Sequence, residues 1–117
     1  MNTTESTKLT LGHSPDPDDA FMFCALAQGW IDTDGLAFEH ILQDIETLNR
    51  RAERSEIDIT ALSAHAYAFL ADRYILLNSG ASMGDGYGPC VIARRPLGAE
   101  HLSRVRIAVP GERTSAF

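Results

Sequence analysis

The strongest constraint on the fold is a repeated alternation of strand-like and helix-like segments. Strands are expected where apolar and polar residues alternate or where short apolar runs occur, at residues 8–13, 36–42, 57–61, 74–77, 90–93 and 106–109. Helices are expected between and after them, at residues 20–27, 45–52, 63–71 and 114–117. Such an alternation forms right-handed crossover units around a mainly parallel sheet. The sequence therefore predicts an α/β fold with flanking helices.

Three of these helices have recognisable starts. Asp18 or Asp19 is a candidate N-cap for the first, and Asp44 and Ser63 are the candidates for the second and third. The first helix, 20–27, is apolar on all sides, which favours a fully buried position. Because the pattern ends at the opening of a fourth helix, the chain is expected to be the front portion of a longer protein.

Glycines are concentrated in residues 79–89, so this segment is expected to be a loop. The run from Gly84 to Gly88 lacks the Lys-Ser/Thr of a Walker loop and does not match Gly-x-Gly-x-x-Gly. A hinge or lid is therefore favoured over nucleotide binding.

Charge and composition exclude several classes of function. The chain has 117 residues, with 10 Lys and Arg against 16 Asp and Glu and a formal net charge of −6, which opposes binding to nucleic acid or to an anionic membrane. No run approaches the ~20 apolar residues of a membrane span. The N-terminal residues lack the pattern of a secretory signal, so a cytoplasmic location is expected. Cys24 and Cys90 are expected to be buried, reduced thiols, and no metal site is predicted.

Candidate binding residues lie at three junctions between a strand and the following helix, 13–19, 61–63 and 109–116. Ligands of parallel α/β sheets bind at the carboxyl ends of strands, beside helix N-termini that attract carboxylates or phosphates. Ser63, Thr114 and Ser115 would add hydroxyl donors there, although Ser63 or Thr114 could equally be only a helix cap.

The first junction carries candidates of a different kind. Asp16, Asp18 and Asp19 would repel an anion, so they are expected to accept hydrogen bonds from ligand hydroxyls or to cap their own helix. The candidate cleft-lining residues are His13, Ser14, Asp18 and Thr114. His13 and His65 also have a purely structural interpretation.

An ordered series of motifs gives the chain a family resemblance. The motifs are Gly12-His-Ser-Pro-Asp-Pro-Asp-Asp-Ala-Phe-Met-Phe23, Gln43-Asp-Ile-Glu-Thr-Leu-Asn49, Thr60-Ala-Leu-Ser63, Asp72-Arg-Tyr74, Ser79-Gly80 with Gly86-x-Gly-Pro89, and Ala108-Val-Pro-Gly111 with Thr114-Ser-Ala116. From about residue 8 to residue 117 the chain resembles the menaquinone-biosynthesis enzymes of the futalosine route. The resemblance is closest to the 1,4-dihydroxy-6-naphthoate synthases, and the related chorismate dehydratases are the alternative.

The resemblance implies a fold like that of the type II periplasmic binding proteins, with two α/β lobes around a cleft. Residues 1–7 would be a disordered lead-in and 8–92 the N-terminal part of the first lobe. Residues 93–117 would be the hinge crossing and the incomplete start of the second lobe. A solute-binding protein of a transporter shares this fold and is a further alternative.

The resemblance also implies a function and its residues. Substrate contacts match Ala61, Leu62 and Ser63 in one lobe and Ser115 and Ala116 in the other, although Ala61 replaces a long basic side chain that relatives can carry. The catalytic base is a histidine expected beyond residue 117, so no catalytic residue is assigned within this chain and the fragment alone is expected to be inactive. The implied reaction converts cyclic dehypoxanthinyl futalosine, a carboxylate, to 1,4-dihydroxy-6-naphthoate and dihydroxyacetone without a cofactor. The oligomeric state stays open.

Overall fold

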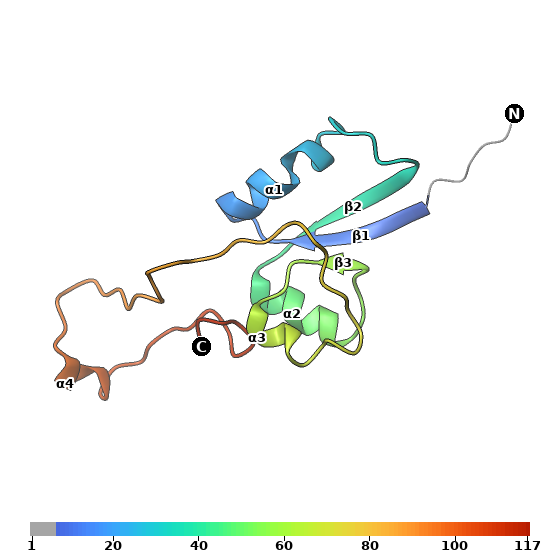
Figure 1. Cartoon of the computed structure of the whole chain (residues 1–117). Coiled ribbons are helices and arrows are strands. Elements are labelled where there is room, and N and C mark those ends of the chain that lie inside the picture. The colour runs from blue at the N-terminus through green and yellow to red at the C-terminus, as the bar shows by residue number, and fades with distance from the viewer. Residues whose placement is uncertain (1–6) are drawn as a thin grey trace, which may run out of the picture.

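The computed structural model describes residues 7–117, which contain three strands and four helices (Figure 1). In chain order the elements are β1 (Thr7–His13), α1 (Pro17–Ala27), β2 (Leu36–Leu42), α2 (Ile45–Glu53), β3 (Ile59–Thr60), α3 (Ala64–Tyr67) and α4 (Ala99–Leu102). The expected lead-in at 1–7 lies outside the described residues, apart from Thr7, which is the first residue of β1.

The three strands form one parallel sheet in the order β2-β1-β3, which confirms the predicted α/β class. β1 pairs with β2 along its full length, from Thr7 opposite Leu36 to His13 opposite Leu42. β3 is shorter than expected and pairs only through Ile59 and Thr60. Figure 1 shows α1 on one side of the sheet and α2 and α3 on the other. The carboxyl ends of β1 and β3 therefore meet at one edge of the sheet.

The core lies between β1, α2 and α3. Its buried apolar side chains are Leu11, Leu48, Ala52, Ile57, Ala66 and Leu70. Gly12 permits the close approach of α2 to the sheet, because a Cβ at that position would lie 2.8 Å from Leu48 Cδ2. Leu48 is completely buried, and burying a leucine side chain stabilises a fold by about 1.5–3 kcal/mol.

Helix α1 differs from its prediction in two respects. It begins at Pro17 with Asp16 as the N-cap residue, whereas Asp18 and Asp19 lie within its first turn. The helix is also largely exposed, and Phe21 is 88% exposed. A helix that is apolar on all sides can place only one face against a three-stranded sheet. Both Cys24, on this helix, and Cys90 are exposed, so the expectation of buried thiols was wrong.

An extended arm replaces the three expected strands after residue 73. Residues 74–77, 90–93 and 106–109 form no strand, and their apolar side chains include the exposed Ile75, Ile92 and Val109. Figure 1 shows this arm first passing along the sheet and then running away from it, with α4 at its far end. The radius of gyration is accordingly 18.1 Å, against about 13 Å for a compact domain of this length. The expected loop at 79–89 contains no regular element, which confirms that prediction.

Two expected helices are also shorter or absent. Ser63 caps α3 as predicted, but the helix ends at Tyr67 and continues only as turns. Residues 114–117 form a turn where a helix start was expected. Asp44 caps α2 as predicted, since its carboxylate accepts a 3.0 Å hydrogen bond from the Thr47 amide.

Candidate functional site

The junction between β3 and α3 supplies three of the five expected substrate contacts. Ala61 continues the pairing of β3 with β1, because its amide donates to the Gly12 carbonyl at 2.8 Å. Ser63 then caps α3, its hydroxyl oxygen accepting from the Ala66 amide at 3.0 Å. Ala61, Leu62 and Ser63 are all half-buried at the edge where β1 and β3 end.

Residues 111–116, called the C-terminal turn below, return to this junction from the far end of the arm. The Ser63 hydroxyl donates to the Arg113 carbonyl at 2.5 Å, and the His65 amide donates to Ser115 Oγ at 3.3 Å. His65 Nδ1 also lies 3.3 Å from the Thr114 carbonyl oxygen. The two expected substrate segments are therefore neighbours, linked through the Ser63–Arg113 and His65–Ser115 hydrogen bonds. Whether they bind substrate stays a prediction.

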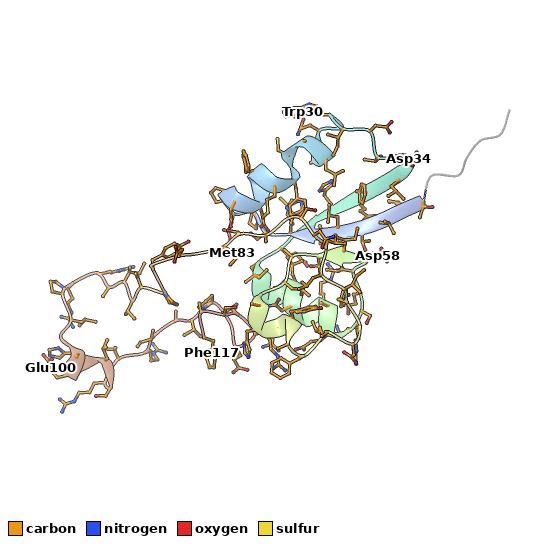
Figure 2. The ribbon with its side chains drawn as sticks, in the orientation of Figure 1. Trp30, Asp34, Asp58, Met83, Glu100 and Phe117 are labelled. Atoms are coloured by element: carbon orange, nitrogen blue, oxygen red, sulfur yellow. The ribbon has the colours of Figure 1, made fainter. Side chains whose placement is uncertain are left out.

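The side chains of the C-terminal turn differ in their availability. Thr114 is buried, and its hydroxyl donates to the Gly111 carbonyl at 2.9 Å. Ser115 and Ala116 are exposed, and Figure 2 shows the chain ending beside them at Phe117. Among the candidates on this turn, Ser115 and Ala116 are thus the residues that a ligand can reach.

Asn49 on α2 connects both segments, and its role was not anticipated from the sequence. The side chain is completely buried. Its Nδ2 donates to Ser63 Oγ at 3.2 Å and to the Arg113 carbonyl at 3.0 Å, while its Oδ1 accepts from the Ser63 amide at 3.2 Å. The available signal was a polar residue with low helix propensity beside the apolar positions Leu48 and Ala52 of an amphipathic helix.

Charged side chains of α2 hold the same turn from both sides of Asn49. Glu46 Oε2 accepts from the Arg113 amide at 2.9 Å, and Glu53 Oε1 lies 2.7 Å from Arg113 Nε. The Arg113 guanidinium also lies 5.2 Å from the centre of the Phe69 ring. Positions 46, 49 and 53 are three and four residues apart, which places them on one helix face. The C-terminal turn packs against that face of α2.

The first junction, at the end of β1, is organised around a pair of histidines. His13 is buried, and its Nε2 lies 3.0 Å from His40 Nδ1 on the neighbouring strand. The Phe23 ring of α1 stacks on His13 at 4.7 Å between centroids. Burial lowers the pKa of His40 below its ordinary value, and the adjacent His13 lowers it further. His13 is therefore packed between Phe23 and His40, as expected for a histidine with a structural role.

The other residues of this junction are mostly satisfied by the protein itself. The Ser14 amide donates to Asp19 Oδ2 at 2.6 Å, and both residues are buried. The Asp19 carboxylate thus accepts a hydrogen bond from the loop before α1 and does not act as the N-cap of the helix. Asp18 is exposed, and a hydrogen bond with Ser82 lowers its pKa.

Residues 7–117 show neither a metal centre nor a membrane-spanning helix. Within this part of the chain, no three side chains among His, Cys, Asp and Glu gather as a metal site would require. No helix in the same range is both long and apolar enough to cross a bilayer. A shallow hollow lies in the arm, along Val91, Arg94 and Leu97, away from the junctions at the sheet edge.

Comparisons with known proteins identify relatives for nearly the whole chain. A family model described as menaquinone biosynthesis matches residues 9–117. The chain is 47% identical over 109 residues to a 1,4-dihydroxy-6-naphthoate synthase of Thermus thermophilus and 35% identical over 109 residues to one of Streptomyces coelicolor. These matches cover 93% of the chain but 39% and 38% of the two relatives. The chain thus spans about two-fifths of the length of these curated relatives.

A solved structure supports the same relationship. The crystal structure of a protein from Archaeoglobus fulgidus matches with a TM-score of 0.66 and 53% sequence identity. The match covers 74% of this chain and 32% of that protein. Given the family match across residues 9–117, the chain belongs to the menaquinone biosynthesis family.

Proposed function

We propose that this chain forms part of a lyase that converts cyclic dehypoxanthinyl futalosine to 1,4-dihydroxy-6-naphthoate and dihydroxyacetone in the cytoplasm. The observation that carries the proposal is the contact of the β3–α3 junction with the C-terminal turn through Ser63 and His65, because it brings together the two segments that match the family's substrate contacts. The names of the Thermus and Streptomyces relatives support the same product. The proposed complete fold is that of the type II periplasmic binding proteins.

In this proposal the chain binds and orients the substrate carboxylate. Ser115 and Ala116 are exposed and lie beside the β3–α3 junction, so their backbone amides and the Ser115 hydroxyl can donate to an anion. Ser63 can donate only after its proton leaves the Arg113 carbonyl, which now accepts it. Donation from Ser63 to the substrate therefore requires its hydroxyl to turn away from the Arg113 carbonyl. Held in this way, the substrate is oriented for proton removal while water is excluded.

The chemical step belongs to a histidine base outside residues 1–117. The base removes a proton from the substrate, the sugar-derived portion leaves as dihydroxyacetone, and the ring system becomes aromatic. We assign no redox cofactor to this step.

The experiment is a chimera in which residues 9–117 replace the matching 109 residues of the Thermus thermophilus relative. The purified chimera is incubated with cyclic dehypoxanthinyl futalosine, and 1,4-dihydroxy-6-naphthoate is followed by chromatography and mass spectrometry. We expect product from the parental chimera and loss of product in its Ser115→Trp variant. Ser79→Trp, on the exposed loop, is the matched control and should retain activity.

Three results would oppose the proposal. A chimera with a cooperative thermal transition that leaves this substrate unchanged would contradict it. Conversion of chorismate with no conversion of the futalosine derivative would favour a chorismate dehydratase. A chimera that converts neither substrate but is protected from heat by a small solute would instead indicate a solute-binding protein.

A further inference from the structure

The buried amide of Asn49 is the point at which three parts of the chain meet. It lies on α2, between the β3–α3 junction and the C-terminal turn, and has no exposed surface. Its three hydrogen bonds go to the Ser63 amide, the Ser63 hydroxyl and the Arg113 carbonyl. A fully buried polar group that is fully engaged fixes the relative position of its partners.

Only a primary amide of this length satisfies all of these partners. The two Nδ2 protons serve two acceptors on different segments, while Oδ1 accepts from a donor on one of them. Aspartate keeps the acceptor but loses both donors, and leucine keeps the approximate shape but loses all three bonds. A glutamine adds a methylene group to a site without free surface, which overpacks it.

Two carboxylates of α2 hold Arg113 of the C-terminal turn against the helix, but they do not set the distance between this turn and Ser63. Glu46 and Glu53 bind the amide and guanidinium of Arg113, one on each side of Asn49. Neither of them bonds to the β3–α3 junction. Asn49 is therefore the α2 side chain whose hydrogen bonds reach both segments.

We propose that Asn49 is a positioning residue, which sets the spacing between Ser63 and the Thr114–Ala116 segment at which both contact the substrate carboxylate. This inference rests on the function proposed above. Asn49 does not itself touch substrate, because its polar atoms are buried and already paired. Its loss should weaken substrate binding more than it slows the chemical step, since the base lies elsewhere.

The test compares Asn49→Leu and Asn49→Ser with the exposed control Asn78→Leu in the active chimera. For both Asn49 variants we expect KM for cyclic dehypoxanthinyl futalosine to rise roughly tenfold or more, with kcat changing by less than about threefold. The control should match the parent in both constants. An Asn49 variant with the parental KM would overturn the inference, even if its melting temperature falls, because a structural role alone lowers stability without changing KM.

A second measurement covers variants that fail to fold. The side-chain amide signals of Asn49 are followed by NMR in the unsubstituted chimera during titration with 1,4-dihydroxy-6-naphthoate. We expect these signals to shift together with the Ser115 amide signal. A shift at Ser115 with none at Asn49 would overturn the positioning role while leaving the proposed function intact. A parental chimera without activity would instead indicate failure of the proposed function.

Discussion

The Ser63 hydroxyl and the Arg113 carbonyl, 50 residues apart in sequence, are joined by a 2.5 Å hydrogen bond. The same hydroxyl oxygen accepts from the Ala66 amide and from Asn49 Nδ2. One side chain thus caps α3, engages α2 and holds the C-terminal turn. A ligand that accepts a hydrogen bond from the Ser63 hydroxyl therefore competes with the Arg113 carbonyl for the same proton.

Replacing Ser63 with alanine should destabilise the chain by about 2 kcal/mol, because the variant loses a helix cap and leaves an Asn49 donor without its partner. The free energy of unfolding is measured by urea titration at low protein concentration. Ser79→Ala, on the exposed loop, is the control and should lie within about 0.5 kcal/mol of the parent. Equal stabilities of the two variants would show that the Ser63 contacts contribute nothing.

Replacing Gly12 with alanine should destabilise the chain by about 1–3 kcal/mol through overpacking. The added Cβ would lie 2.8 Å from Leu48 Cδ2 and 2.9 Å from Thr60 Oγ1, both on elements packed against β1. Gly88→Ala is the matched control, since a Cβ there meets nothing within 4 Å. Thermal unfolding followed by circular dichroism distinguishes the two, and a Gly12→Ala melting temperature at or above that of Gly88→Ala would refute the close packing.

The paired histidines should make stability depend on pH. Because the pKa of folded His40 is lowered from 6.5, the unfolded chain binds more protons between the two pKa values. The contribution of neutral His40 to stability is therefore complete above about pH 6.5 and is lost as the pH falls through the folded pKa. As the pH is lowered from about 6.5 through the folded pKa of His40, the melting temperature of His40→Gln should fall less than that of the parent. His101→Gln, on the exposed α4, should keep the parental slope; an unchanged slope in His40→Gln would contradict the assignment.

The arm should cause self-association, because many of its apolar side chains are exposed. Ile75 and Ile92 are 85% and 91% exposed, whereas monomeric proteins seldom expose large contiguous apolar patches. Sedimentation velocity over a range of concentrations should show association of the 117-residue chain. Ile92→Lys should reduce it, and the charge control Ser79→Lys should not. A chain that stays monomeric throughout would count against this view of the arm.

Local signals in the sequence predicted much of the sheet and α2. β1 and β2 follow from the alternation at residues 8–13 and 36–42, and the Asp44 cap sets the start of α2 one residue later, at Ile45. These features depend on neighbouring residues alone. The motifs around Ser63 and Ser115 predicted that both segments contribute to one site, but as segments facing each other across a cleft, and their contact through Arg113 and His65 was not predicted.

The features that were not predicted from the sequence depend on contacts between residues that are distant in the chain. Residues 90–93 have the composition of a strand, but a strand also needs a hydrogen-bonded neighbour, and this segment has none among residues 7–117. Asparagine is a residue type expected on the solvent-facing side of a helix, and the burial of Asn49 follows only from its contacts with Ser63 and Arg113. The His13–His40 contact likewise depends on the pairing of β1 with β2.

The most direct measurement of the shared site is an NMR titration of the chimera with 1,4-dihydroxy-6-naphthoate, following the backbone amides of Ser63 and Ser115. Both signals should move with one dissociation constant, because the two segments are held together through Arg113 and His65. Tight binding of this product that shifts neither amide, or that shifts only one of them, would contradict a single site built from the β3–α3 junction and the C-terminal turn.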